Sequence, residues 1–351
     1  MITERRLRIA IAGFGRIAWQ YHIPNIINHP QFHLVAVADP LLQRIAEAGT
    51  EFGITNGYQS IPQMLEQEKP DLLVIASPTC FHTEQAIEAF KCGIDVICEK
   101  PLACSVKDAR KIQQMMRHCQ RKLMVYQPHR LTPEAVILKN ILSSGVLGRI
   151  FMVRRSCCNF SRRNDWQAFS AYGGGMLNNY GSHFIDQFIY LFGGSFKSVN
   201  AVTRRIVSGG DAEDFVKMLA VNGHDITFDL EINMAAAITG QEWLVCGDCG
   251  SAAFRSSSGW QIRYFDPSQL KTGVVQSGLA AEGRLYPSEP DIHWTENLIS
   301  SETVPLNDFY EFCYRYFAMD EAPLVPIENT MEVMETLERC RQAAPLIASE
   351  L

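Results

Sequence analysis

One polar stretch in the middle of the chain carries residue types suited to proton transfer. The segment GGGMLNNYGSHFIDQ occupies residues 173–187, where three glycines precede a run that contains Asn179, His183 and Asp186. If this run is a helix, the three side chains share one face. Histidine titrates near neutral pH, so His183 can exchange a proton with a hydroxyl group. We interpret His183 as an acid–base residue and Asn179 as an amide that orients a substrate.

The same stretch allows other interpretations. A metal ion can bind histidine and carboxylate, but one histidine with two flanking oxygen groups is a sparse ligand set, and we therefore predict no metal. Asp186 either orients His183 or accepts a hydrogen bond from neighbouring backbone or from a lysine. We expect the glycines at 173–175 to let the helix start approach a cofactor or substrate without an intervening side chain.

A second motif lies near the N-terminus, between a strand-like run and a helical pattern. GFGRIA, residues 13–18, matches the dinucleotide-binding pattern G-x-G-x-x-G/A, in which Gly13 permits a tight turn and Gly15 lets a pyrophosphate approach the backbone. Asp39 ends the next strand-like run, where a carboxylate accepts hydrogen bonds from a ribose and repels a 2′-phosphate. We therefore expect NAD rather than NADP. Asp39 as a turn cap and Arg44 as a phosphate-tolerant neighbour are the competing interpretations.

Polar residues also follow two later strand-like runs, as SPTCFH at 77–82 and EKP at 99–101. Ligands bind at the carboxyl ends of parallel strands in open α/β sheets. Lys100 at such an end, beside a positively charged nicotinamide, would have a lowered pKa and can donate to a substrate oxygen. Pro101 restrains the chain after it and can take the cis form.

The elements that must position these residues change in rhythm near residue 128. Before it, strand-like runs alternate with helical patterns, and the runs lie at 7–13, 33–39, 72–77, 95–101 and 122–127. This alternation predicts parallel strands joined by right-handed crossovers. After it, strand-like runs succeed one another, and the helical patterns lie at 133–145, 176–192, near 305–319 and at 328–348. The fold is thus predicted as α/β, with a doubly wound Rossmann domain over 1–128 and an α+β domain with a mainly antiparallel sheet over 129–351.

Composition narrows the classes of partner. The 351 residues have a net charge of −6, which argues against binding to nucleic acid. No stretch approaches the ~18 consecutive apolar residues of a membrane span. Eleven cysteines, an odd number spread along the chain, suit a reducing cytoplasm. Cys246 and Cys249 flank a Gly-Asp turn signal and predict a hairpin rather than a zinc site. The polar residues 266–304 predict a surface excursion.

The chain resembles the Gfo/Idh/MocA family of oxidoreductases, named after glucose–fructose oxidoreductase and inositol dehydrogenase. The resemblance depends on five features in chain order, namely GFGRIA, Asp39, SPTCFH, CEKP and GGGMLNNYGSHFID. The resemblance implies a large open sheet in the second domain. It also implies NAD(P)-dependent chemistry on a sugar, cyclitol or related polyol, by a homodimer or homotetramer assembled through that sheet. It also implies that Lys100 and His183 are catalytic. From motif and resemblance together, the residues expected to bind the cofactor are Gly13, Phe14, Gly15, Arg16, Ile17, Asp39, Ser77, Pro78, Thr79, His82, Glu99, Lys100 and Gln127.

One position departs from the family pattern. Many relatives have aspartate where this chain has Asn179, and an amide cannot accept a proton at neutral pH. We therefore do not expect this chain to use the mechanism of inositol dehydrogenase unaltered. Glycosides or nucleotide-linked sugars become candidate substrates. Arg163, Asp165 and Trp166 predict a polar rim and an aromatic platform for a pyranose, against the alternative of an exposed loop with one anchoring Trp. His129 and Arg130 follow Gln127 closely enough to reach the same cleft.

The sequence therefore predicts hydride transfer between a nicotinamide and a secondary alcohol or ketone of a sugar, glycoside or cyclitol. Two alternatives stay open. One is a reductase acting on a keto-sugar or dihydrodiol-type substrate. The other is a sugar-sensing regulator that has lost turnover, a reading that expects Lys100 or His183 to be missing, and both are present.

Overall fold

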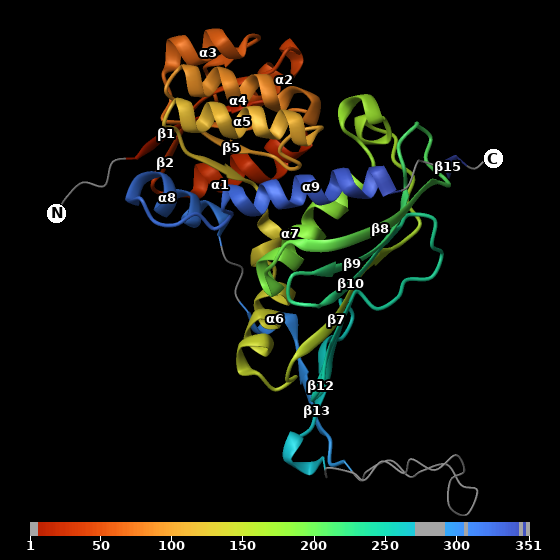
Figure 1. The fold of residues 1–351 in the computed structure, drawn as a ribbon. Helices are drawn as coiled ribbons and strands as arrows, with labels where there is room; N and C mark the ends of the chain where they lie inside the picture. The colour runs from red at the N-terminus through yellow and green to blue at the C-terminus, as the bar shows by residue number, and fades with distance from the viewer. Residues whose placement is uncertain (1–5, 271–291, 305–307, 344–346, 349–351) are drawn as a thin grey trace, which may run out of the picture.

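Nearly continuous apolar runs form the strands of the first sheet because helices cover both of its faces. The computed structural model describes residues 6–270, 292–304, 308–343 and 347–348 (Figure 1). Six strands, all paired in parallel, follow the order β3-β2-β1-β4-β5-β6. They are β1 (Leu7–Ala12), β2 (Phe32–Ala38), β3 (Gly57–Tyr58), β4 (Leu72–Ile75), β5 (Asp95–Cys98) and β6 (Leu123–Val125). The predicted doubly wound sheet is confirmed, and its order reverses between β1 and β4, where α/β folds bind ligands.

The helices of this half begin and end at ordinary cap signals. Ser105 accepts a hydrogen bond from the Asp108 amide at the start of α5, and Gly53 ends α2 in the left-handed region. The helix predicted over 16–28 is present, but its middle is a π-helical segment. The helical segments are η1 (Ala18–His22), α1 (Ile23–Asn28), α2 (Leu42–Phe52), α3 (Ile61–Glu68), α4 (His82–Lys91) and α5 (Val106–His118). The short helix α3 was absent from the sequence prediction.

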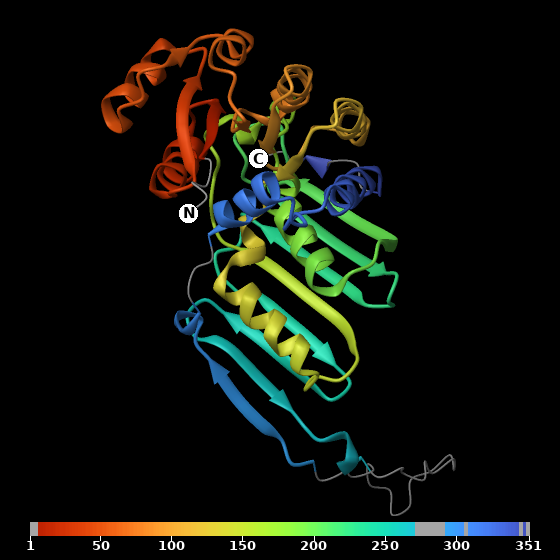
Figure 2. The same cartoon turned by 90° about the vertical axis from the view of Figure 1, so that its left-hand side faces the viewer.

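The second sheet has nine strands in the order β14-β13-β12-β11-β7-β10-β9-β8-β15, and only the β7–β10 and β8–β15 pairs are parallel. The mainly antiparallel sheet is therefore confirmed. Its strands are β7 (Ile150–Cys158), β8 (Phe196–Arg205), β9 (Phe215–Asn222), β10 (Thr227–Asn233), β11 (Trp243–Gly247), β12 (Gly250–Arg255), β13 (Gly259–Tyr264), β14 (Thr295–Ile299) and β15 (Ile347–Ala348). Figures 1 and 2 show one face covered by α6 (Pro133–Ser144), α7 (Ser182–Phe192) and α9 (Ile327–Ala343).

Two sequence predictions in the last third need correction. Residues 295–299 form the edge strand β14 inside the predicted surface excursion, of which residues 271–291 lie outside the described residues. Its side chains are mostly exposed, so its sequence lacks the apolar alternation of a buried strand. The last helix ends at residue 343, and residues 347–348 form β15 instead of continuing it. Elsewhere the predicted hairpin is confirmed, because Gly247 pairs with Gly250 around a two-residue turn.

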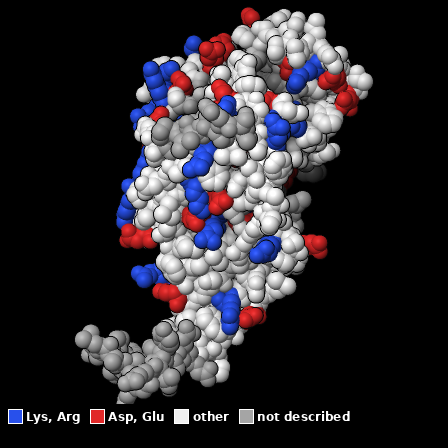
Figure 3. Space-filling view, turned by 90° about the vertical axis from the view of Figure 1, so that its right-hand side faces the viewer, with Lys and Arg blue, Asp and Glu red and all other residues white. Residues whose placement is uncertain are grey.

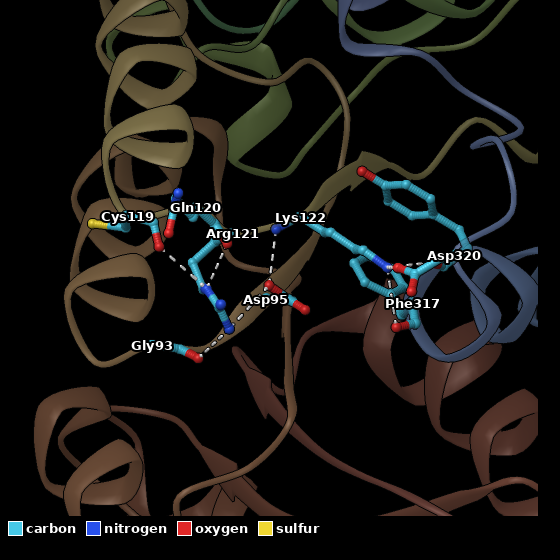
Figure 4. A network of polar contacts seen from close by, with 9 residues as sticks. Gly93, Asp95, Cys119, Gln120, Arg121, Lys122, Phe317 and Asp320 are labelled. Atoms are coloured by element: carbon cyan, nitrogen blue, oxygen red, sulfur yellow. Dashed lines mark hydrogen bonds and ion pairs between the residues drawn. The ribbon is translucent and has the colours of Figure 1, made fainter.

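The C-terminal helices return to the first sheet. Lys122, just before β6, donates through Nζ to the Tyr316 carbonyl at 2.8 Å in α8 (Phe309–Met319) and contacts Asp320 at the end of that helix. Its own amide donates to Asp95 Oδ1 at 2.8 Å, so one residue joins β5, β6 and α8 (Figure 4). The two sheets are thus connected by late segments as well as by the chain near residue 128. The domain division at that residue stays a prediction.

The uncovered face of the second sheet carries charges that are already paired. Asp229 binds Arg154 at 3.0 Å and Lys217 at 2.6 Å, and Lys217 also binds Glu231 at 3.1 Å. Figure 3 views the molecule from this side and shows positive and negative side chains next to one another between wide uncharged areas. Assembly through this face stays a prediction. Among the described residues, no helix combines the length and the apolar character needed to cross a bilayer.

Candidate active site

The glycine-rich turn after β1 lies directly against the end of β4. Gly13 has a φ of +93°, and a Cβ there would lie 2.9 Å from the Ser77 backbone nitrogen, so only glycine fits. A helix begins at residue 16, so free amide groups follow the turn. Phe14 is buried, whereas Arg16 is exposed and Ile17 half-buried. This arrangement fits a dinucleotide pyrophosphate.

Asp39 supports this turn from the end of β2. Its two carboxylate oxygens accept hydrogen bonds from the amides of Phe14 and Leu41, each at 2.9 Å. The predicted turn-capping role is therefore present, and each oxygen retains a lone pair for a ribose hydroxyl. Arg44 donates to the Phe14 carbonyl at 2.9 Å and lies 3.5 Å from the position of a Cβ on Gly15. A cation thus lies against the glycine-rich turn.

Glu99 follows directly after β5, and its carboxylate is buried in the protein. Glu99 accepts from His22 Nε2 at 3.0 Å and from the Lys100 amide at 3.1 Å, and His22 Nδ1 lies 2.7 Å from the Tyr310 hydroxyl. Burial raises the pKa of Glu99, but the His22 hydrogen bond and the Lys100 charge outweigh burial and lower the pKa overall. The Lys100–Pro101 peptide is cis. Glu99 therefore braces the lysine, and its contact with a cofactor stays a prediction.

The SPTCFH segment is tied to the same strand end. The His82 ring nitrogens lie 2.9 Å from the Ser77 carbonyl oxygen and 3.0 Å from that of Pro101, and Ser77 Oγ donates to Gln85 at 2.7 Å. Pro78 is half-buried and Thr79 is buried. In this structure these side chains hold two loops together, and direct cofactor contacts from them stay predictions.

The three glycines at 173–175 have a different role from the expected one. A Cβ on Gly173 would lie 2.8 Å from the Thr79 Cβ, one on Gly174 2.4 Å from a carbonyl oxygen, and one on Gly175 2.2 Å from Glu213 Oε1. The glycines therefore pack against their own chain, and the expectation that they face a cofactor or substrate is wrong. Glu213 accepts the Leu177 amide at 2.9 Å and so caps the helix start.

Lys100 crosses from the first sheet to this helix. Its Nζ donates to the Asn179 carbonyl oxygen at 2.8 Å and to Asn179 Oδ1 at 3.0 Å. Asn179 lies in a π-helical turn, η6 (Leu177–Gly181), immediately before α7, and such wide turns are frequent at functional sites. Burial lowers the pKa of the Lys100 ammonium to about 8, while Glu99 opposes this change and Arg163 adds to it. The lysine is thus held one turn from His183.

His183 is buried and held by one ring nitrogen. Its Nδ1 lies 2.7 Å from Gln127 Oε1, and Gln127 Nε2 donates to the Ser182 carbonyl at 3.4 Å. An amide oxygen only accepts, so with this amide orientation Nδ1 carries the proton and Nε2 keeps its lone pair. No described residue hydrogen-bonds Nε2. Burial, His129 and Lys100 lower the pKa of His183 well below its usual value. The ring is thus a neutral imidazole able to accept a proton.

Asp186 has neither of the predicted roles. Its carboxylate forms a two-point ion pair with Arg130, whose Nε and NH2 each lie 2.7 Å from one oxygen, and both side chains are buried. Burial raises the pKa of Asp186, and the arginine opposes that effect. The pair fixes α7 to η3 (Pro128–Leu131). His183 is oriented by Gln127 instead of by Asp186. The arginine in HRLTP was the available sequence signal, but spacing alone did not assign its partner.

The predicted substrate rim meets the glycine-rich turn. Asp165 Oδ2 accepts from Arg16 at 2.9 Å and lies 3.7 Å from Arg163 NH1, while Oδ1 caps the turn η4 (Trp166–Ala168). Trp166 is half-buried. The structure therefore brings the rim segment and the glycine-rich turn together through one ion pair. Binding of a sugar by these residues stays a prediction.

Two protein-family models match the chain. One is described as an oxidoreductase family with an NAD-binding Rossmann fold and matches residues 7–127, and the other is the GFO/IDH/MocA C-terminal domain, residues 136–253. The D-glucoside 3-dehydrogenase of Escherichia coli (strain K12) is 30% identical over 204 residues, covering 57% of this chain and 58% of the enzyme. The chain thus spans little more than half the length of that relative.

Two further comparisons cover more of the chain. The rhizopine catabolism protein MocA of Rhizobium meliloti is 26% identical over 75% of this chain and 80% of that protein. The crystal structure of an NAD-binding protein from Listeria innocua has the same fold, with a TM-score of 0.83 at 24% identity over 97% of both chains. Because the two family matches run in order through both sheets, the chain belongs to the Gfo/Idh/MocA family of oxidoreductases and has an NAD-binding Rossmann fold.

Proposed function

We propose that the protein transfers a hydride between the nicotinamide of NAD and a secondary alcohol or ketone of a sugar, glycoside or cyclitol. One observation carries this proposal: the Lys100 ammonium binds Asn179, one turn before His183, whose Nε2 is not hydrogen-bonded by any described residue. A cation and a neutral base beside the end of a dinucleotide-binding sheet suit carbinol oxidation. The glucoside dehydrogenase named above supports a glycoside as substrate.

Each residue has one task in the oxidation direction. His183 Nε2 accepts the proton of the reacting hydroxyl, and the Lys100 ammonium stabilises the negative charge that develops on its oxygen. Asn179 Oδ1 is occupied by Lys100, so its amide NH2 group is left to donate to a substrate oxygen. The nicotinamide, when bound, supplies the hydride acceptor. In the reverse direction the protonated His183 returns its proton to the carbonyl oxygen.

A substrate panel tests the proposal. The enzyme is mixed with NAD and with methyl glucosides, inositols and free sugars, and NADH formation is followed by absorbance. Keto-sugars with NADH test the reverse direction, in which faster turnover would favour the reductase alternative. Sugar binding without turnover in either direction would favour a sensor and contradict the proposal.

Cofactor choice is expected to depend on Asp39. Asp39→Asn removes a negative charge beside the expected ribose, so the ratio of NADP to NAD use, measured as kcat/KM, should rise on the order of tenfold, or about 1.4 kcal/mol. Arg44→Ala is the opposing control and should lower NADP use. An unchanged ratio in Asp39→Asn would show that the carboxylate only supports the Phe14 amide.

The Arg16–Asp165 ion pair is expected to position the rim without entering the chemistry. Because both side chains are partly exposed, Asp165→Asn should raise the sugar KM by up to about fivefold and leave kcat within about a factor of two. Wild-type KM should move towards the variant value at high salt, where the pair is screened. Asp225→Asn removes a more exposed pair with Lys197 and serves as the control. A changed kcat in Asp165→Asn would contradict this role.

A further inference from the structure

A second imidazole lies against the proposed base. The rings of His129 and His183 are stacked face to face, with centroids 3.8 Å apart and an interplanar angle of 3°. They come from different elements, since His129 lies in η3, directly after β6, and His183 in α7. His183 is anchored through Nδ1 to Gln127. The stack therefore joins the end of the first sheet to the helix that carries the base.

His129 differs from His183 in having a free polar edge. Within the part of the chain that the structure describes, neither ring nitrogen of His129 has a hydrogen-bond partner, and only its backbone carbonyl is bound, by Gln187 and Thr132. The residue is half-buried, so part of it remains accessible. This accessible polar edge is thus left for a ligand or solvent to bind. The packing role of the ring does not account for its nitrogens, because a phenyl ring stacks equally well.

The charge state of His129 suits a hydroxyl partner. Burial lowers its pKa to about 3, with Lys100 and Arg155 adding to this effect, so the ring is neutral at ordinary pH. A neutral imidazole offers one donor and one acceptor, which matches the two functions of an alcohol oxygen. An anionic group on the ligand would instead bind the neighbouring cation Lys100.

We propose that His129 binds a second hydroxyl of the substrate, on a carbon adjacent to the reacting one, so that the enzyme selects vicinal diols. The ring centroids are 3.8 Å apart, so the two side chains can bind neighbouring hydroxyl groups of one ligand. While His183 Nε2 takes the proton of one hydroxyl, a nitrogen of His129 holds the other. This inference rests on the proposed function and names a specificity-determining residue for it.

Deoxy sugars combined with a ring-preserving variant test the inference. The probes are methyl β-D-glucopyranoside and its 2-, 3- and 4-deoxy analogues. The analogue that is not oxidised identifies the reacting carbon. An analogue lacking the adjacent hydroxyl that His129 binds should lose about 10- to 100-fold in wild-type kcat/KM. His129→Phe keeps the stack and should lose a similar factor on the parent glucoside, with no additional loss on that analogue.

Binding provides a second readout. Calorimetric titration of the enzyme–NADH complex with the same glucosides should show the same loss of affinity, and His224→Phe, in an exposed turn, should change neither measurement. Equal kcat/KM for every oxidised sugar in the wild type, or equal losses on parent and analogues in His129→Phe, would overturn the inference while turnover still supports the proposed function. Absence of turnover and of binding for every glucoside, inositol and free sugar of the panel would overturn both.

Discussion

His183→Ala is expected to lower kcat by about 10²–10⁴-fold while NADH still binds. The structure leaves Nε2 of His183 without a partner among the described residues, and Gln127 holds Nδ1 at 2.7 Å. The ring is therefore oriented before a substrate arrives. Removing it takes away the proton acceptor without touching the glycine-rich turn. Rates with saturating sugar and NADH binding by fluorescence together measure the two effects.

The pH dependence of wild-type activity provides a second test of the role of His183. As a base, His183 works only when deprotonated, so activity in oxidation falls as pH drops through its pKa. Because burial, His129 and Lys100 hold that pKa well below the usual value, the acidic limb should lie below pH ~6.5, the ordinary histidine value. His224→Ala is the matched control. Full kcat in His183→Ala would show that another group takes the proton.

Lys100→Met is expected to lower kcat by about 10²–10³-fold, the usual cost of losing one preorganised charge at a developing oxyanion. The ammonium is fixed by two oxygens of Asn179. Methionine keeps an unbranched side chain, one atom shorter than that of lysine, and lacks the charge and its donors. Sugar affinity should change less than kcat because the charge acts on the transition state. Lys197→Met, at an exposed ion pair, is the control.

The alkaline side of the profile identifies this lysine. Burial lowers the pKa of Lys100 to about 8, so the ammonium is present below this pH and is lost as pH rises through it. Wild-type kcat/KM should therefore decline above pH about 8, and the decline should be absent in Lys100→Met. A decline that persists in the variant would assign it to a different group.

Local features of the fold followed from local patterns. Apolar runs alternating with helical periodicity predicted the parallel sheet because each pattern reflects which faces of an element are buried. The turn at Gly13 was predictable because its backbone requires a φ that other residues disfavour. Glu99 and Lys100 were predicted to lie at a strand end because the apolar run of that strand stops just before them.

Features that lack such a signature escaped prediction. The edge strand β14 is mostly exposed, and backbone pairing with β13 rather than burial of its side chains holds it in the sheet. The π-helical turns at 18–22 and 177–181 change the helical hydrogen bonding over only five residues each, and no residue pattern in the sequence marked them. The glycines at 173–175 were expected to allow a ligand to approach, yet the atoms that exclude a Cβ belong to the same chain, and those at Gly173 and Gly175 come from distant segments.

Tertiary structure decided the partners of the site residues. Lys100 and Asn179 are 79 positions apart, Gln127 and His183 are 56 apart, and Arg16 and Asp165 are 149 apart. Each of these polar groups has many chemically suitable partners in the sequence, and only the packing of the helices against the two sheets selects one. The residue types therefore predicted the chemistry of the site, whereas the folded chain determined that Asp186 binds Arg130 and that Gln127 orients the proposed base.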